Sequence, residues 1–304
     1  MSTTSAQLAS PPAAAVATRP PRRIGWHVRR IPPIVWLCSA ILVVVFASAV
    51  FAPILAPHDP EEQSLIKRLQ PPAWMPDGES EYPLGTDQLG RDVLSRILFG
   101  ARISLAIGFF AVIIGSIFGS LMGLIAGYFG GWTDELISTL ADIQLAFPFI
   151  LLAITVIAVL GPSELDLIIL IGISGWMTYA RVCRGVVLGL REREFVQAVR
   201  ALGGGDWRIM LRHILPNILS PIIVLATLDL ARLIILESTL SFLGLGIQPP
   251  KPSWGGMLGE GRDYLSDAWW IATFPGLAIM LTTLAISRGG DWVRDVLDPT
   301  LRSA

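Results

Sequence analysis

Six long apolar runs, separated by polar segments, dominate the pattern along the chain. They cover about residues 34–56, 103–129, 143–160, 165–188, 218–245 and 269–286. An α-helix needs ~20 residues to cross the ~30 Å hydrocarbon core of a bilayer, and the runs are close to that length. Proline and glycine occur inside several runs, which neighbouring helices in a membrane tolerate. The pattern therefore predicts an all-α polytopic membrane protein with six transmembrane helices and both termini on the same side.

Polar segments divide the rest of the chain. Residues 1–33 are rich in Ala, Pro, Ser and Thr and carry five arginines, which is typical of a disordered basic tail. In the outer loop we expect a short interfacial helix at 87–98, packed as a lid on the bundle; contact with a binding protein is the alternative. The expected order is a cytoplasmic tail (1–33), a first span (34–56) and an outer loop (57–102). A core of five spans follows (103–290), which includes the connecting loop 191–216, and then a C-terminal tail (291–304).

Four glycines recur at a spacing of four in the second run: Gly115, Gly119, Gly123 and Gly127. This spacing places them on one face of a helix, where another backbone can approach closely. We therefore expect a helix-packing face. A groove along which a helix slides is the alternative.

The positions of lysine and arginine indicate which side of the membrane each loop faces. Fifteen of the 23 lie on one side of the six-span arrangement: five before residue 31, seven between 181 and 212, and three from 288 onward. Seven lie on the other side, and Arg232 lies inside a span. Because cytoplasmic loops carry the excess of positive charge, both termini and the loop 191–216 are predicted to be cytoplasmic.

Composition agrees with a membrane protein and argues against several kinds of site. Of the 304 residues, 53% are hydrophobic and 15% are charged, whereas about a quarter are charged in soluble domains. The net charge of −1 argues against a nucleic-acid partner, which would require a basic face. Cys38 and Cys183 lie in or beside apolar runs without a Cys-x-x-Cys pattern, so we expect buried thiols and no metal. Neither lysine lies in a Gly-x4-Gly-Lys-Ser/Thr pattern, so any Walker-type ATP site would come from another chain.

One polar stretch, FVQAVRALGGGDWRIMLRHILPN, interrupts the apolar sequence with arginines and three consecutive glycines. We expect a helix over 191–202 that ends at the glycines 203–205, because glycine favours the left-handed conformation at helix ends. Asp206 is expected to N-cap a second short helix over 207–214, and Pro216 to close the segment. An amphipathic connector on lipid headgroups would also explain the arginines. The small residues at the bend favour instead a compact protrusion that inserts into a groove of a partner protein.

The same stretch resembles the EAA loop of bacterial ABC-importer permeases. The family pattern is Glu-Ala-Ala, three residues, Gly, nine residues and Ile-x-Leu-Pro; here Gln197-Ala198-Val199 is followed by Gly203 and Leu215-Pro216. The chain departs from the pattern at three positions, where Gln197 stands for Glu, Val199 for Ala and His213 for Ile. Five further stretches resemble the permeases of dipeptide and oligopeptide importers: YPLGTDQLGRDVLSRILFGARISL, AGYFGGWTDELI, AFPFILLAI, SFLGLGIQPPKPSWGGML and GDWVRDVLDPTLR. Together they cover most of 82–302, and the short outer loop 246–268 is similar to that of the second of the two permease subunits.

This resemblance implies the permease subunit of an ATP-driven, binding-protein-dependent importer in the bacterial cytoplasmic (inner) membrane. Such a subunit pairs with a homologous second permease in the lipid bilayer, two ATPase subunits dock on its cytoplasmic loop, and an extracytoplasmic binding protein delivers the substrate. ATP and Mg would be held by the ATPase subunits, so this chain is expected to be no enzyme and to bind no cofactor. Peptide is the favoured substrate, with glutathione and nickel chelates as alternatives. The residues implied in ATPase docking are Gln197, Ala198, Ala201, Leu202, Gly203, Gly204, Gly205, Asp206, Trp207, Arg208 and Pro216.

Three charged residues inside the fifth run are candidates for the substrate path. Asp229 and Arg232 are three residues apart, hence neighbours on a helix, and we expect them to neutralise each other. Glu237 has no partner at helical spacing and is the stronger candidate, because it could meet a substrate's amino group. A hydrogen bond from Glu237 to the partner permease is the alternative.

Two other functions fit parts of the sequence. Gly172-Ile173-Ser174-Gly175 resembles the Gly-x-Ser-Gly pattern of rhomboid proteases, but that chemistry needs a histidine base, and no histidine lies in a predicted span. A secondary transporter or channel would need its own ion site in the membrane, for which Asp229 and Glu237 are available. That alternative leaves the glycine-broken loop without a role.

Overall fold

Residues 32–297 are described by the computed structural model of the chain. The predicted tail 1–33 lies almost entirely outside this range, as do residues 298–304. Within the range the chain is helical and forms no strand, and Thr86 and Asp92 form an isolated β-bridge. Five helices are long and apolar enough to cross a membrane, and a bent helix pair makes a sixth if its two halves count as one span. The predicted fold class is confirmed.

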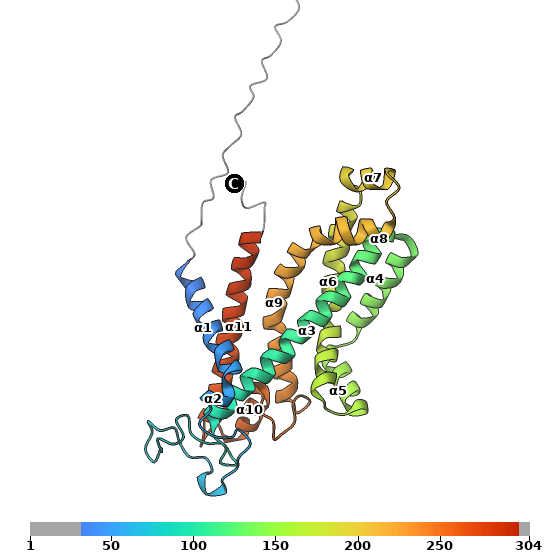
Figure 1. Cartoon of the computed structure of the whole chain (residues 1–304). Helices are drawn as coiled ribbons and strands as arrows, with labels where there is room; N and C mark the ends of the chain where they lie inside the picture. The colour runs from blue at the N-terminus through green and yellow to red at the C-terminus, as the bar shows by residue number, and fades with distance from the viewer. Residues whose placement is uncertain (1–31, 298–304) are drawn as a thin grey trace, which may run out of the picture. The chain divides into compact units, whose positions relative to one another are not determined.

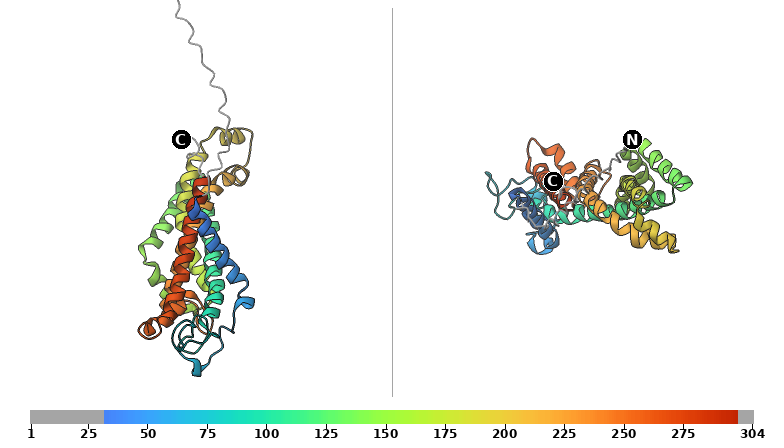
Figure 2. Two further views of the ribbon diagram at one scale, coloured as in Figure 1. Left: turned by 90° about the vertical axis from the view of Figure 1, so that its left-hand side faces the viewer. Right: turned by 90° about the horizontal axis from the view of Figure 1, so that it is seen from above.

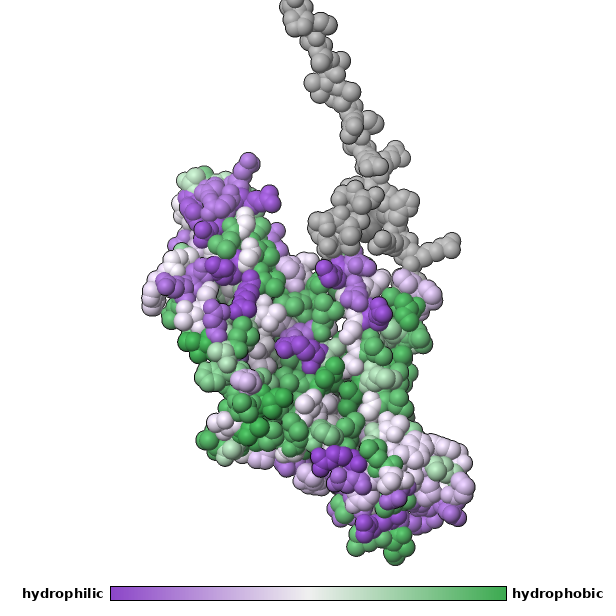
Figure 3. Space-filling model, turned by 180° about the vertical axis from the view of Figure 1, so that it is seen from behind, coloured by the Kyte–Doolittle hydropathy of each residue, from purple (hydrophilic) through white to green (hydrophobic). Residues whose placement is uncertain are grey.

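The candidate spans pack together as one bundle, and polar segments lie at both of its ends. They are α1 (Pro33–Val50), α3 (Val93–Phe129), the pair α4 (Gly131–Ala146) and α5 (Phe149–Leu160), α6 (Glu164–Leu190), α9 (Leu215–Phe242) and α11 (Trp270–Leu297). The shorter helices are α2 (Ala52–Leu55), η1 (Leu65–Lys67), α7 (Glu194–Ala201), α8 (Asp206–Arg208), η2 (Ile209–Ile214), α10 (Trp254–Gly261) and η3 (Arg262–Tyr264). The start of α1 and the end of α11 lie at the same end of the bundle as α7, whereas α10 lies at the opposite end (Figures 1 and 2). A hydrophobic band separates the two hydrophilic ends (Figure 3).

Helices α3 and α6 form the most extensive helix contact of the bundle. The glycine stripe of α3 faces the α6 backbone: a Cβ added to Gly119 would lie 2.1 Å from the carbonyl oxygen of Trp176, and one on Gly123 would lie 2.3 Å from that of Ala180. On the α6 side, a Cβ added to Gly172 would lie 3.0 Å from the carbonyl oxygen of Ala111. Both helices therefore use glycine for close approach. The predicted packing face is confirmed, and Gly172 of the protease-like pattern belongs to it.

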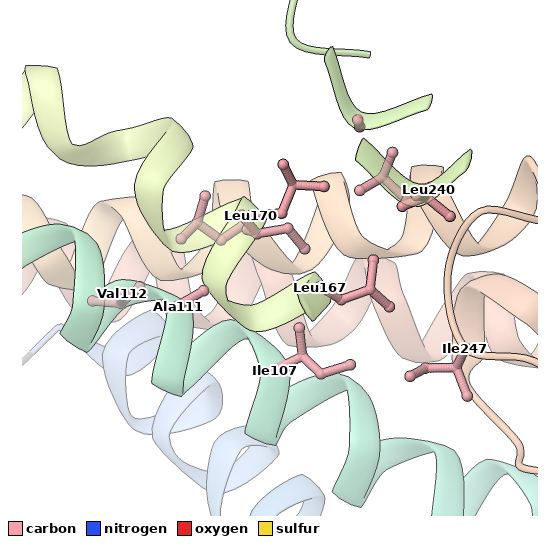
Figure 4. Close-up of a cluster of buried hydrophobic side chains, with 11 residues drawn as sticks. Ile107, Ala111, Val112, Leu167, Leu170, Leu240 and Ile247 are labelled. Carbon is pink, nitrogen blue, oxygen red and sulfur yellow. The ribbon is translucent and has the colours of Figure 1, made fainter. Parts of the chain in front are cut away.

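One apolar core joins α3, α6 and α9 near α5. Ile107 and Ala111 of α3 contact Leu167 and Leu170 of α6, and Leu240 of α9 closes the cluster (Figure 4). All five side chains are less than 10% exposed. This cluster holds α9, which carries the intramembrane charges, against the α3–α6 pair.

The third predicted span is broken. α4 and α5 meet at 87°, with Phe147 extended at φ −99° and ψ 127° between them. The ring of Pro148 disfavours the helical conformation of the residue before it, which explains the break. α4 remains attached to α6 through Arg184, whose Nη2 donates to Asp134 Oδ2 at 2.6 Å. The prediction of one continuous helix over 143–160 is therefore wrong.

The predicted interfacial helix at 87–98 is also wrong. Residues up to Asp92 form a turn, and the Asp92 carboxylate accepts a hydrogen bond from the Ser95 backbone at 2.8 Å, which caps α3. α3 therefore begins ten residues before the predicted second span. The turn does pack as a lid: Arg91 is 1% exposed and bonds Asp87 at 2.6 Å and Glu260 of α10 at 2.7 Å.

The other helix ends differ less from the sequence-based boundaries. α1 ends at Val50, after which α2 continues the first run, and α11 extends to Leu297. The predicted C-terminal tail from residue 291 is therefore helical in its first seven residues. Cys38 and Cys183 are buried free thiols, as expected.

Candidate functional site

The 191–216 loop begins with α7, which ends in a hydrogen-bonded glycine turn. Gly203 lies at φ +79°, its N–H donates to Arg200 O at 3.0 Å, and the N–H of Gly204 donates to Val199 O at 2.9 Å. These two bonds form a Schellman motif, which needs a left-handed residue at the position of Gly203. The predicted glycine stop is confirmed, and it reverses the chain within three residues.

Asp206 does not have the predicted role of N-cap. Gly205 occupies that position with extended backbone angles, and Asp206 is the first residue of α8. Its carboxylate instead accepts a hydrogen bond from the hydroxyl of Tyr128, at 2.6 Å. Tyr128 lies in the last turn of α3, so Asp206 links the loop to the central helix of the bundle.

Two further contacts strengthen this link. Arg200 Nη2 donates to the Tyr128 hydroxyl at 3.4 Å, and its guanidinium carbon lies 5.8 Å from the ring centroid. Its hydrogen bond to Tyr128 raises the pKa of Arg200, so this side chain stays charged. Arg191 Nη1 donates to Gly127 O at 3.0 Å. The sequence did not indicate Tyr128, because a tyrosine at the end of an apolar run carries no distinctive signal.

The second helix of the loop does not end before the next span. α8 continues through the π-helical segment η2 directly into α9, and Pro216 lies in the first turn of α9. The missing N–H of Pro216 removes one hydrogen bond from this continuous helix, and the π-helical turn η2 lies just before it. The prediction that Pro216 closes the segment is therefore wrong. α8 and α9 are therefore parts of one continuous helix, joined through η2.

Apolar side chains anchor the loop, and others are exposed. Val196 of α7 and Ile209, Met210 and Ile214 of η2 are completely buried in a cluster with α3 and α6. By contrast, Leu202 is 88% exposed and Trp207 is 65% exposed on either side of the glycine turn. The residues expected to dock an ATPase are exposed with the exception of the half-buried Gly204: Gln197, Ala198, Ala201, Leu202, Gly203, Gly205, Asp206, Trp207, Arg208 and Pro216. The bend thus presents two large apolar side chains on a firmly held base.

Gln197 occupies the position of the family glutamate. Its Nε2 donates to Arg191 O at 3.2 Å, near the end of α6. An amide can donate this bond, whereas an ionised carboxylate cannot. The substitution therefore gives the loop an internal contact in place of a charge.

Replacing Tyr128 by phenylalanine is expected to loosen the loop without unfolding the bundle. The ring remains packed, but the charge-assisted hydrogen bond to Asp206 is lost, and such bonds contribute about 1.5–3 kcal/mol. Amide hydrogen exchange over 194–208 should become about ten-fold faster or more. Tyr264→Phe is the matched control, because no hydrogen bond of its hydroxyl is found among residues 32–297. Equal exchange in wild type and Tyr128→Phe would contradict the link.

The intramembrane pair forms as expected. Arg232 Nε donates to Asp229 Oδ1 at 2.6 Å, and the hydroxyl of Tyr179 on α6 donates to Asp229 Oδ2 at 3.1 Å. The two partners differ in exposure, because the Asp229 side chain is 7% exposed and that of Arg232 is 54% exposed. Asp229 is therefore held inside the protein, while Arg232 reaches the surface of the subunit.

Glu237 does have a partner at helical spacing, contrary to expectation. The hydroxyl of Ser241, four residues later, donates to Glu237 Oε1 at 2.7 Å, and Ser238 Oγ lies 3.4 Å from Oε2. The residue is fully buried within the subunit. Its role in the substrate path stays a prediction. Sequence spacing considered only charged partners, and so the serine was missed.

A helical bundle with apolar spans, an intramembrane charge pair and a protruding bent loop is typical of a transport permease of the membrane. Comparison with known proteins shows the family to which the chain belongs. Residues 119–303 match the family described as binding-protein-dependent transport system inner membrane component, and residues 32–72 match the N-terminal TM domain of oligopeptide transport permease C. The chain belongs to this family of ABC-importer permeases.

Individual relatives of the chain are permeases of the same kind. The chain is 46% identical over 264 residues to a di/tripeptide transport system permease of Pseudomonas aeruginosa, with 87% of each chain covered. It is 40% identical over 288 residues to a glutathione transport system permease of Pectobacterium atrosepticum, with 94% of each covered. An inward-facing structure of the MetNI methionine ABC transporter superposes with a TM-score of 0.53 at 18% identity, covering 66% of this chain and 96% of that chain. That likeness concerns the fold.

Proposed function

We propose that this permease imports small peptides across the cytoplasmic membrane, driven by ATPase subunits that dock on the 191–216 loop. It would form half of the translocation path, with a homologous permease as the other half and an extracytoplasmic binding protein as the donor of substrate. ATP and Mg would be bound by the ATPase subunits. The loop end of the bundle, which also contains the start of α1 and the end of α11, would face the cytoplasm, in agreement with the excess of positive charge on that side.

The observation that carries the proposal is the exposed bend at Leu202–Trp207 on a fixed base. Large apolar side chains that are exposed at a compact protrusion indicate a protein partner. The bend is bonded to α3 through Tyr128 and is continuous with α9 through η2. A partner that moves the bend would therefore move two central helices, which is what a two-state transporter requires.

The substrate class follows from the relatives alone. Their names specify di/tripeptide, dipeptide and glutathione transport, and glutathione is itself a tripeptide. A small peptide with a free carboxylate is common to all three. The cognate binding protein would select among such peptides.

Dependence of uptake on the ATPase subunits tests the proposal. Cells that express this chain with its partner permease, its binding protein and both ATPase subunits should accumulate radiolabelled dialanine against its gradient. Omission of the ATPase subunits should abolish accumulation. Accumulation without them would contradict the proposal and favour a secondary transporter that uses the intramembrane carboxylates.

A further inference from the structure

A pocket of about 270 Å³ lies where the third span is broken. Its walls come from α4, the break at Phe147, α5, α6 and α9. Phe147, Phe149, Leu152 and Met177 make much of this lining apolar. The volume lies near the lower limit for small-molecule sites, which span about 300–1,000 Å³. It therefore suits part of a small solute rather than a long chain.

Arg232 is the charged residue among those that line the pocket. Its Nε is bonded to Asp229, but its terminal nitrogens Nη1 and Nη2 have no hydrogen-bond partner within residues 32–297. Asp229 is in turn fixed by Tyr179 and does not line the pocket. A Cβ added to Gly175 would lie 3.4 Å from both Arg232 Nη2 and Asp229 Oδ2, so the glycine leaves room for the pair against α6. The pair therefore directs its positive end toward the pocket and its negative end into the protein.

Polar groups near the guanidinium complete the lining. Ser174 and Thr178 are four residues apart on one face of α6, and both line the pocket. The Ser174 hydroxyl donates to Ile171 O at 2.6 Å and keeps its lone pairs free to accept. Gln144 donates to Ile173 O at 3.2 Å and accepts from the Trp176 ring N–H, so its amide is engaged within the wall. Among residues 32–297, the lining thus offers a cation and hydroxyls but no carboxylate.

We propose that this pocket receives the carboxylate of the transported solute, with Arg232 as its ligand and Asp229 as the residue that orients Arg232. The inference rests on the proposed import function and specifies the chemistry of its path. A guanidinium with two free terminal nitrogens matches the geometry of a carboxylate. A carboxylate that enters an apolar passage loses hydration, and a positioned guanidinium offsets that loss. Because Asp229 already neutralises part of the charge, binding stays weak enough for release.

This assignment differs from the sequence-based expectation for the path. Glu237 was the stronger candidate there, as a partner for a substrate's amino group. The structure buries Glu237 completely between serines of its own helix and exposes Arg232 instead. The path residue on this subunit therefore recognises the negative end of a peptide rather than its positive end.

A comparison of two solutes tests the inference in the complete importer. Dialanine and its C-terminal amide differ in the carboxylate, and uptake of each is measured at saturating concentration in wild type and in Arg232→Gln. Arg232→Gln removes the proposed hydrogen bond to the carboxylate of dialanine, whereas the amide has no carboxylate and so loses no such bond. The ratio of acid uptake to amide uptake should therefore be at least about ten-fold higher in wild type than in the variant. Any preference of the binding protein for the acid or the amide cancels from this comparison, because the same binding protein serves the wild-type and the variant complex. Arg232→Lys should retain part of the ratio.

Arg181→Gln is the matched control. Arg181 also pairs with an aspartate, Asp142, at 2.7 Å, and its side chain is 53% exposed, but it lies outside the pocket. Its acid-to-amide ratio should equal that of wild type. If Arg232→Gln lowers uptake of both solutes equally, or prevents assembly with the second permease, Arg232 is a structural contact and the inference fails. If the wild-type complex does not accumulate dialanine at all, the proposed peptide function fails first.

Discussion

Replacing Gly119 by leucine is expected to abolish the folded subunit, whereas the same change at Gly185 leaves it intact. Gly119 lies at the closest approach of α3 to α6, where an added Cβ would be 2.1 Å from a backbone oxygen. Gly185 lies on α6, and within residues 32–297 no atom of another element lies within 4 Å of an added Cβ. The two substitutions have the same effect on helix propensity and hydrophobicity, so the comparison isolates the helix contact.

The expected size of the effect follows from the kind of atom that is contacted. Overpacking a core typically costs 1–3 kcal/mol when side chains can rotate away. Here the obstacle is the carbonyl oxygen of Trp176, which moves only if α6 moves as a whole. Separation of α3 from α6 would also break the neighbouring contacts of Gly115, Gly123 and Gly127. We therefore expect a loss above about 3 kcal/mol and no monodisperse protein.

Size-exclusion chromatography in detergent and thermal unfolding measure the outcome. Wild type and Gly185→Leu should elute as one symmetric peak with similar melting temperatures. Gly119→Leu should aggregate or fail to accumulate in the membrane. A stable Gly119→Leu subunit would show that α3 and α6 do not pack through the stripe.

Local patterns in the sequence were sufficient to locate the apolar runs and the helix contact that this prediction tests, although not the break in the third run. Glycines that recur every four residues lie on one face of a helix, whichever helix that face contacts. The glycine turn at Gly203 is equally local, because the left-handed conformation is a property of the residue itself. Such features need no knowledge of the partner element.

Features that depend on contacts between distant segments of the chain were missed. Asp206 could N-cap a helix by its residue type, but the nearby hydroxyl of Tyr128, 78 positions earlier, binds its carboxylate instead. The pairing of Asp229 with Arg232 could be predicted from spacing, whereas the exposure of one partner and burial of the other depends on how α9 packs on α6. The broken third span had a local signal in Pro148, but prolines are tolerated in other spans, such as Pro221 in α9 and Pro275 in α11.

The second large effect is expected at the tip of the loop, from Leu202→Asp. The side chain is 88% exposed, so in the isolated subunit the change removes almost no packing, and folding should be unaffected. In the assembled importer the same side chain would be buried against an ATPase subunit, where a charge without a partner is strongly unfavourable. The few side chains that dominate a protein interface each contribute about 2 kcal/mol or more, and Leu202 at the tip of the bend is expected to be one of them, so docking should weaken by about 30-fold or more.

Copurification and uptake separate this effect from a folding defect. Leu202→Asp should insert, elute as a single peak and pair with the second permease, yet fail to retain the ATPase subunits and to support uptake. Leu265→Asp provides the control, because Leu265 is also an exposed leucine, at 55%, and follows η3, which adjoins α10 at the opposite end of the bundle. It should retain the ATPase subunits as wild type does. If Leu202→Asp retained them equally well, the bend would not be the docking element, and the transmission of movement through Tyr128 and η2 would lose its starting point.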